Sequence, residues 1–215
     1  MNMKKLVILG AGGFGREVHA WLLDIMKTRE DLSIVGFLDD NADRFRGLSD
    51  MPPVVGSFRS YSLSPDEFLV CAVGDPTVKI KAWHHWKAQG ANFFTLIHPT
   101  ALIQKDVEIG EGCVICPMAS VASGSKLDFL VALNVLARVD EGVRIGAAST
   151  LSGHVFVGRN ARLGEGAFLS SQAVVEENVC VGVRSKIGAG SVARTNVAEG
   201  ATVFGVPARQ IAGFN

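Results

Sequence analysis

VRIGAASTLSGHVFVGRNARLGEGAFLS, residues 143–170, repeats one pattern every six residues. An aliphatic side chain occupies each sixth position, beginning with Ile145 and Leu151. A small or β-branched side chain stands two positions before each of them, as Val143 and Ser149 do. Two columns with one six-residue period indicate a stacked structure in which both sets of side chains point into a common interior.

The period continues in both directions, from Ile97 to Ile187. All sixteen positions of the first column are aliphatic: Ile97, Ile103, Ile109, Ile115, Val121, Leu127, Leu133, Val139, Ile145, Leu151, Val157, Leu163, Leu169, Val175, Val181 and Ile187. This period is typical of a parallel β-helix, in which each face of a triangular coil takes one hexapeptide. We predict a β-helix domain over residues 93–215, with the glycines of the repeat, such as Gly110 and Gly146, relieving backbone strain near its corners.

The composition limits the classes of partner. The 215 residues include 21 Lys and Arg and 21 Asp and Glu, so no positive field attracts nucleic acid or an anionic membrane. No run approaches the roughly 20 apolar residues needed for membrane insertion. We expect small molecules and copies of the same chain as partners. The chain opens Met-Asn-Met-Lys-Lys and runs directly into a strand pattern without a signal peptide, so a cytoplasmic location is predicted.

Cysteines offer the strongest candidate for a metal site in this sequence. Cys113 and Cys116 have a CxxC spacing, but neither a second pair nor paired histidines accompany them. The six-residue register places Cys113 in the interior of the β-helix. We therefore interpret the pair as structural and expect no metal.

A different pattern occupies residues 1–92. The apolar run of residues 6–9 predicts a buried parallel strand, and Gly10-Ala11-Gly12-Gly13-Phe14-Gly15 follows it before a helical pattern. Glycines allow the backbone to lie close to a phosphate, and the free N–H groups at the start of a helix attract its charge. Gly10, Gly12 and Gly13 are therefore predicted to bind a nucleotide, although an α/β domain can need a glycine turn there for packing alone.

Two more predicted strands end in acidic residues. Residues 34–38 lead into Asp39, and residues 68–73 lead into Gly74 and Asp75. Asp39 suits a ribose hydroxyl, and Asp75 lies where open parallel sheets bind ligands. Residues 1–92 thus form a Rossmann-like α/β domain. They make only half of a dinucleotide fold, so a nucleotide-linked substrate fits better than NAD.

The order of motifs along the whole chain resembles a known family. The Gly10–Gly13 loop, Ile97-His98-Pro99-Thr100-Ala101, the hexapeptides, residues 188–192 (GAGSV) and residues 205–208 (GVPA) are similar to bacterial sialic acid O-acetyltransferases and nucleotide-amino-sugar N-acetyltransferases of the bacillosamine and perosamine type. The resemblance implies a left-handed β-helix that binds acetyl-CoA and an N-terminal domain that binds the nucleotide-linked amino sugar. It further implies a homotrimer with active sites between neighbouring β-helices. Gly153, Gly188, Gly205 and Pro207 are the acyl-CoA-binding residues that it suggests.

The sequence departs from this family at the catalytic centre. Relatives carry a His-Asp pair after an Asn-centred hexapeptide, and a gap-free match through Asn134 places Glu141 and Gly142 there. A second histidine of some relatives falls at Thr150, and a glycine one turn beyond the base falls at Arg159. The general base expected from the family is therefore replaced.

Two residues are candidates for the missing base. Glu141 occupies the position of the histidine, although a carboxylate with a pKa near ~4.3 needs burial or a like charge to accept a proton at neutral pH. His154 belongs to the residue type with a pKa near ~6.5 and stands at a predicted corner of the repeat. Glu141 can also be a solvated corner residue, and His154 lies thirteen residues after it, at a different corner of the coil.

The sequence therefore predicts acyl-CoA-dependent transfer, expected to be of acetyl, to an amino or hydroxyl group of a nucleotide-linked sugar, in surface polysaccharide biosynthesis. A relative that binds nucleotide-sugar or CoA without turnover is the alternative. A Rossmann oxidoreductase and a β-helix carbonic anhydrase are more remote, since the latter needs three metal-binding histidines and the chain has five scattered ones.

Overall fold

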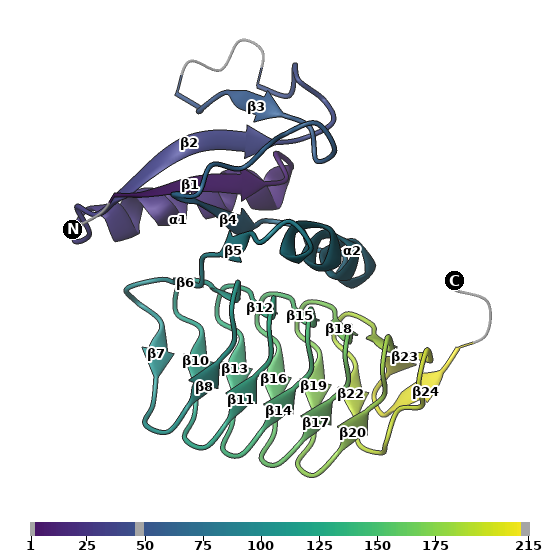
Figure 1. Cartoon of the computed structure of the whole chain (residues 1–215). Helices are drawn as coiled ribbons and strands as arrows, with labels where there is room; N and C mark the ends of the chain where they lie inside the picture. The colour runs from purple at the N-terminus through teal and green to yellow at the C-terminus, as the bar shows by residue number, and fades with distance from the viewer. Residues whose placement is uncertain (1–2, 46–49, 212–215) are drawn as a thin grey trace.

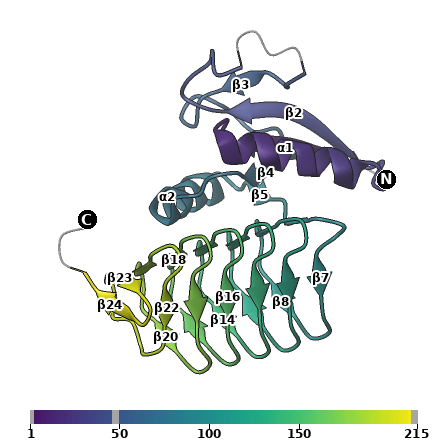
Figure 2. The same cartoon turned by 180° about the vertical axis from the view of Figure 1, so that it is seen from behind.

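The computed structural model describes residues 3–45 and 50–211. It consists of an α/β sheet that lies against one side of a long parallel β-helix (Figure 1). Seen from behind, helix α1 crosses the near face of the sheet, and helix α2 lies between the sheet and the β-helix (Figure 2). Both predicted fold classes are confirmed.

The N-terminal sheet has the order β3-β2-β1-β4-β5, and its strands are parallel. Its strands are β1 (Lys4–Leu9), β2 (Leu32–Leu38), β3 (Val54–Gly56), β4 (Glu67–Cys71) and β5 (Asn92–Phe93). Helices α1 (Gly13–Met26) and α2 (Pro76–Lys87) cover opposite faces of the sheet. Successive side chains of a strand point to opposite faces, so alternate residues of β1 pack against different helices. Leu6 and Ile8 pack in the cluster that contains α1, whereas Val7 and Leu9 pack with Ala82 of α2.

The β-helix has three faces, each a ladder of short strands, and residues eighteen apart are partners except where β23 and β24 end the first face. The face beside α2 contains β6 (Leu96–Ile97), β9 (Val114–Ile115), β12 (Ala132–Leu133), β15 (Thr150–Leu151), β18 (Phe168–Leu169), β21 (Lys186–Ile187), β23 (Thr202–Gly205) and the antiparallel β24 (Ala208–Gln210). The second face contains β7 (Leu102–Ile103), β10 (Ser120–Val121), β13 (Arg138–Val139), β16 (Phe156–Val157), β19 (Val174–Val175) and β22 (Val192–Ala193). The third face contains β8 (Glu108–Ile109), β11 (Lys126–Leu127), β14 (Arg144–Ile145), β17 (Arg162–Leu163) and β20 (Cys180–Val181).

The interior of the β-helix contains the two predicted columns. From Ile115 to Ile187, the aliphatic column is at most 4% exposed and forms one continuous cluster with the small residues two positions before. Cys113 lies inside this cluster, as its register predicted. Burial raises the pKa of the Cys113 thiol to about 12, which makes it a poor nucleophile.

Five glycines that we predicted to relieve backbone strain are needed for another reason. Gly110, Gly146, Gly158, Gly164 and Gly182 do not have positive φ, so they relieve no left-handed strain. A Cβ at each would lie within 3.0 Å of backbone atoms of the next coil, and they are therefore needed for close stacking. Gly188 instead leaves space for the ring of Phe204. The corners with positive φ also accept other residues, among them Asp106 and Asn160.

Candidate functional site

The loop after β1 contains glycines with separate roles. Gly10 has φ +101°, a conformation that favours glycine, and its N–H donates to the carbonyl of Leu38 at 2.9 Å. A Cβ on Gly15 would overlap the Gly10 carbonyl, so α1 lies directly on the loop. A Cβ on Gly12 or Gly13 would meet nothing within 4 Å. The space beside the first turn of α1 is thus open to a ligand.

Asp39 fixes this loop against the end of β2. Its Oδ2 accepts a hydrogen bond from the N–H of Ala11 at 2.9 Å, and its Oδ1 accepts one from Asn41 at 3.0 Å. The guanidinium of Arg44 lies 3.8 Å away. The carboxylate that we predicted to bind a ribose therefore also shapes the glycine loop, and its contact with a ribose stays a prediction.

A cavity of about 380 Å³ opens at the carboxyl ends of β1, β2 and β4. We call it the sheet-edge cavity; its lining includes Gly10, Asp39, Asp40, Phe58, Arg59 and Lys81. Two of the residues predicted to bind substrate, Gly10 and Asp39, thus lie together. The location matches the general rule that ligands bind outside the carboxyl ends of parallel strands.

A second cavity, of about 360 Å³, separates the first half of α2 from the β-helix. We call it the interdomain cavity; its lining includes Asp75, Lys81, Glu165, Phe168, Arg184 and Lys186. Asp75 is the N-cap of α2, and its carboxylate accepts from the N–H of Val78 at 2.9 Å. Asp75 therefore lies beside, and not inside, the cavity that holds Gly10 and Asp39.

Hydrogen bonds between the end of β4 or helix α2 and earlier coils of the β-helix hold the two domains together beside this cavity. The hydroxyl of Thr150 donates to the carbonyl of Gly74 at 2.9 Å, at the end of β4. The amine of Lys79 is fully buried and donates to the carbonyls of Leu130 and Ser149 at 3.0 Å each. Burial lowers the pKa of Lys79 to about 8. Thr150 thus joins the two domains.

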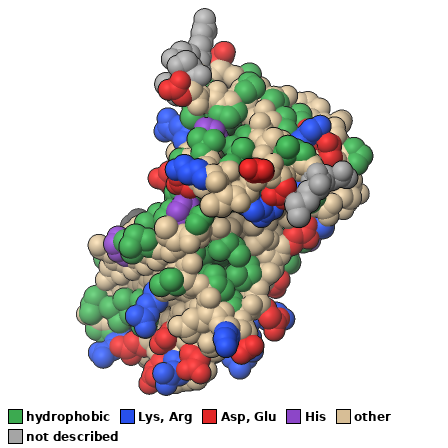
Figure 3. All heavy atoms as spheres, turned by 90° about the vertical axis from the view of Figure 1, so that its left-hand side faces the viewer, with side chains coloured by type: hydrophobic (Ala, Val, Ile, Leu, Met, Phe, Trp, Pro, Cys, Tyr) green, Lys and Arg blue, Asp and Glu red, His purple; other side chains and the backbone are tan. Residues whose placement is uncertain are grey.

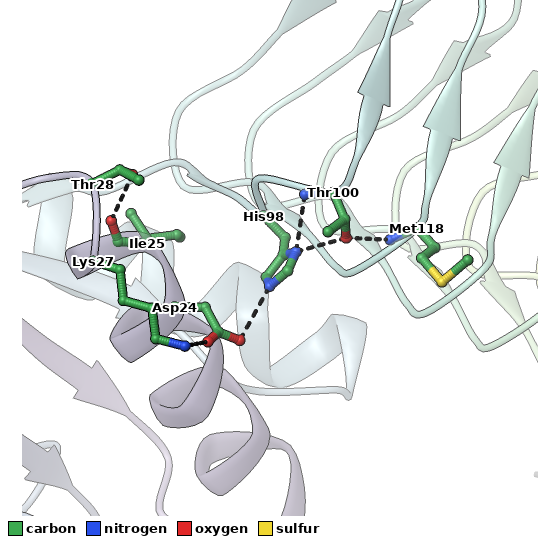
Figure 4. Close-up of polar contacts among 7 residues, drawn as sticks. All are labelled: Asp24, Ile25, Lys27, Thr28, His98, Thr100 and Met118. Carbon is green, nitrogen blue, oxygen red and sulfur yellow. Dashed lines mark hydrogen bonds and ion pairs between the residues drawn. The ribbon is translucent and has the colours of Figure 1, made fainter.

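His98 joins the domains at the other end of the interface (Figure 4). The backbone N–H of Thr100 donates to Nδ1 at 3.2 Å, and the hydroxyl of Thr100 lies 2.8 Å from the same atom. Nδ1 therefore carries no proton, and Nε2 directs its N–H toward Asp24 of α1 at 3.4 Å. Lys27 and then His98 lower the pKa of Asp24. This network favours a structural role for His98.

The two candidates for the base lie at different corners of the β-helix. Glu141 stands at the turn between β13 and β14, and its carboxylate is 3.6 Å from the guanidinium of Arg159. His154 is exposed at the turn between β15 and β16, with φ +60°. Within one chain the structure does not bring them together.

The residues predicted to bind acyl-CoA fall into two groups. Gly153 directly precedes His154 at its corner. Gly188, Gly205 and Pro207 gather near the C-terminal end. A Cβ on Gly188 would meet the ring of Phe204, Gly205 is the last residue of β23, and Pro207 lies between β23 and β24. Their contact with CoA stays a prediction. In the described ranges, no group of three or more His, Cys, Asp or Glu side chains is arranged to hold a metal ion.

Comparison with known proteins decides the family. Residues 5–85 match the PglD N-terminal domain. The acetyltransferase domain of PglB from Neisseria gonorrhoeae FA1090 is 30% identical, with a TM-score of 0.88 over 97% of this chain and 100% of that one. The chain belongs to the bacillosamine- and perosamine-type acetyltransferase family.

Two further family members add detail. A GDP-perosamine N-acetyltransferase variant from Caulobacter crescentus, with a histidine replaced by alanine, is 26% identical, with a TM-score of 0.85 over 97% of both chains; its structure contains CoA and GDP-perosamine. UDP-N-acetylbacillosamine N-acetyltransferase of Bacillus subtilis (strain 168) is 32% identical over 117 residues, 53% of this chain and 51% of the relative. The match therefore spans about half the length of that curated relative.

Apart from Asp75, the charged and aromatic residues that line the interdomain cavity were missed by the sequence analysis. Lys81 carries no motif, and Phe168 and Lys186 stand at outward positions of hexapeptides whose inward residues carry the pattern. Glu165 and Arg184 are ordinary corner residues by sequence. Only the position of α2 over this part of the β-helix gives them a common surface.

Proposed function

We propose that this protein is an acyl-CoA-dependent transferase that acetylates an amino or hydroxyl group of a nucleotide-linked sugar. In the N-transfer form, the amine nitrogen attacks the thioester carbonyl, a C–N bond forms, the C–S bond breaks, and CoA leaves as the thiol with the proton of the amine. A base and an N–H donor for the developing oxyanion assist such a step. Synthesis of surface polysaccharides in the cytoplasm is the proposed setting.

One observation carries the proposal. The sheet-edge cavity and the interdomain cavity lie next to one another on a scaffold shared with a relative whose structure contains CoA and GDP-perosamine. A cavity at the carboxyl edge of a parallel sheet suits a nucleotide, and the adjacent cavity against the β-helix suits the attached sugar.

A homotrimer is the proposed assembly. Exposed apolar side chains gather at the first coils of the β-helix, where Leu102, Met118 and Leu136 are 68%, 59% and 38% exposed. Figure 3 looks onto this end of the molecule and shows hydrophobic side chains grouped on the β-helix, with charged ones along its lower edge. Contact with other copies would cover such a surface. A monomer at micromolar concentration in light scattering would contradict the trimer.

A binding-only relative is the second candidate. The sequence predicts Glu141 at the position of the family's histidine and Arg159 at that of a glycine, and these two side chains form an ion pair. A relative with a substituted histidine still has CoA and GDP-perosamine bound in its structure. Binding of both ligands therefore does not by itself prove turnover, so the two have to be measured separately.

The test begins with thermal-shift screening against UDP-, GDP- and dTDP-linked amino sugars, with and without acetyl-CoA. A ligand at 100 times its Kd adds about 2.7 kcal/mol to the free energy of unfolding. Turnover is then followed by chromatography of the acetylated sugar, because the exposed thiol of Cys180 would react with a thiol-detecting dye. Shifts with product formation support the transferase, and shifts without product support the binding-only relative. The absence of a shift with every nucleotide-sugar contradicts the transferase, and the absence of a shift with acetyl-CoA as well contradicts both.

A further inference from the structure

The sheet-edge and interdomain cavities meet at Lys81. This residue of α2 lines both, and its side chain is exposed. Their volumes, about 380 and 360 Å³, are each within the range of small-molecule sites. A ligand with two compact ends and a charged middle can therefore occupy both cavities, with its middle beside Lys81. A nucleotide-linked sugar has this form.

The two cavities differ in what they offer to each end. The sheet-edge cavity has the ring of Phe58 for a base and the carboxylates at the end of β2 for ribose hydroxyls. The interdomain cavity has the ring of Phe168 and the side chain of Ile80, against which the apolar face of a sugar can pack. The sugar end therefore belongs in the interdomain cavity, where the β-helix supplies part of the lining.

Some charged groups of the interdomain cavity are already engaged. The carboxylate of Asp75 caps α2, and the guanidinium of Arg184 pairs with Glu199 at 2.9 Å. Among the residues that the structure describes, Lys81, Glu165 and Lys186 line the cavity without an ion pair or a side-chain hydrogen bond. These three are the charges available to a ligand.

The backbone of Glu165 is held firmly. Its carbonyl accepts from the N–H of Arg184 at 2.8 Å. On the other side, a Cβ on Gly146 would lie 2.5 Å from the Glu165 nitrogen, so the coils are in close contact there. A Cβ on the following residue, Gly166, would lie 3.6 Å from Pro76 of α2. Glu165 is thus placed on a rigid corner directly opposite the first turn of α2.

We propose that Glu165 is the residue that recognises the amino group of the acceptor sugar, while Lys81 contacts the diphosphate; the inference rests on the proposed function. The charges of the ligand alternate in the same order as those of the site. A diphosphate is negative and meets Lys81, and a protonated amine is positive and meets Glu165. Acetylation removes the charge of the amine, so the product loses this contact with Glu165. The product should therefore dissociate more readily than the substrate does.

The test is calorimetry on the full chain at neutral pH with three probes: a nucleoside diphosphate, the amino-sugar nucleotide that gives the largest thermal shift, and the same nucleotide linked to the corresponding hydroxy sugar. A charge-assisted hydrogen bond should give the wild-type protein about ten-fold preference for the amine over the hydroxyl. Glu165→Gln should lose this preference and keep its affinity for the nucleoside diphosphate. Lys81→Met should weaken all three ligands alike.

Glu177→Gln is the matched control, because Glu177 is an exposed carboxylate at another corner of the β-helix. It should retain the wild-type preference. If Glu165→Gln binds the nucleoside diphosphate normally and still prefers the amine about ten-fold, Glu165 is not the recognition group, although the proposed function stands. If the wild-type protein binds none of the nucleotide-sugars, the inference and the proposed function are both wrong.

Discussion

The amine of Lys79 lies 3.0 Å from the carbonyl oxygen of Ser149, and this hydrogen bond joins helix α2 to the β-helix. Lys79 is fully buried, and no carboxylate is bonded to its amine in the described part of the chain. Cys71, Cys113 and Asp75 are the titratable groups that influence it. The domain interface thus contains a titratable group whose charged form is disfavoured by burial.

Comparison of the wild type with Lys79→Met should show how the titration of Lys79 makes the free energy of unfolding depend on pH. The pKa of Lys79 is about 8 in the folded chain and near 10.5 when unfolded, so the unfolded state binds more protons between these values. The free energy of unfolding of the wild type should therefore rise relative to the variant between about pH 8 and 10.5, by on the order of 3 kcal/mol. Denaturant unfolding of both proteins from pH 7 upward measures the difference. A difference that does not change with pH would contradict the burial of a titrating amine.

Gly12→Val should separate binding from folding. A Cβ on Gly12 meets nothing within 4 Å, so the fold should tolerate the substitution within about 1 kcal/mol, the usual effect of a changed helix N-cap. The new side chain fills the space beside the first turn of α1, so nucleotide-sugar affinity should be lost while acetyl-CoA still binds. Calorimetry measures both ligands.

Gly15→Ala is the contrast to this substitution, because its Cβ would overlap the Gly10 carbonyl. It should lower stability by several kcal/mol. Unchanged nucleotide-sugar affinity in a folded Gly12→Val protein would remove the glycine loop from the binding site.

A pair of substitutions tests why the repeat contains glycine. Gly146→Ala places a Cβ 2.5 Å from the nitrogen of Glu165 and should cost about 1–3 kcal/mol or more. Gly124→Asn, at a corner with φ +69° and open space around its Cβ, should be nearly neutral, because Asn160 and Asn178 already adopt this conformation at other corners. Thermal unfolding of both variants measures the two losses of stability. Equal losses would contradict the conclusion that close stacking, and not backbone conformation, requires glycine at position 146.

The β-helix was predictable because its period records side chains that point inward. The sequence did not reveal why Gly110 and Gly146 must be glycine. Both are required by close contact between neighbouring coils and not by a positive φ. In the N-terminal domain, the strand ends at Gly10, Asp39 and Asp75 could be placed at one edge, since parallel strands present their carboxyl ends together.

The interdomain cavity could not be predicted. It depends on how α2 docks, and the docking is set by single contacts such as Lys79 with Ser149 and Thr150 with Gly74. These contacts join residues 70 or more positions apart, with no local pattern at either end. Nothing in the sequence therefore distinguished Glu165 and Phe168 from the corresponding residues of other hexapeptides.

Glu141→Gln, His154→Asn and the double variant test the identity of the base. If His154 accepts the proton, His154→Asn should lower kcat/KM by about 10²- to 10⁴-fold while both ligands still bind. If Glu141 accepts the proton, Glu141→Gln should show that loss instead. The residues stand at different corners, so in one chain they cannot act as a pair. If both contribute, their losses in the logarithm of the rate should add, whereas the losses of a dyad that acts as a unit do not.

Arg159→Gln separates the carboxylate of Glu141 from its ion-pair partner and is the positional control. Near-wild-type rates in both single variants and in the double variant would reject both residues. An amine that arrives already deprotonated could then attack with only backbone donors to assist, and the pH profile of kcat/KM would follow the substrate. An absence of turnover in the wild type, with both ligands bound, would instead favour the binding-only relative, because a site that lacks its proton acceptor can keep its affinity while it loses its chemistry.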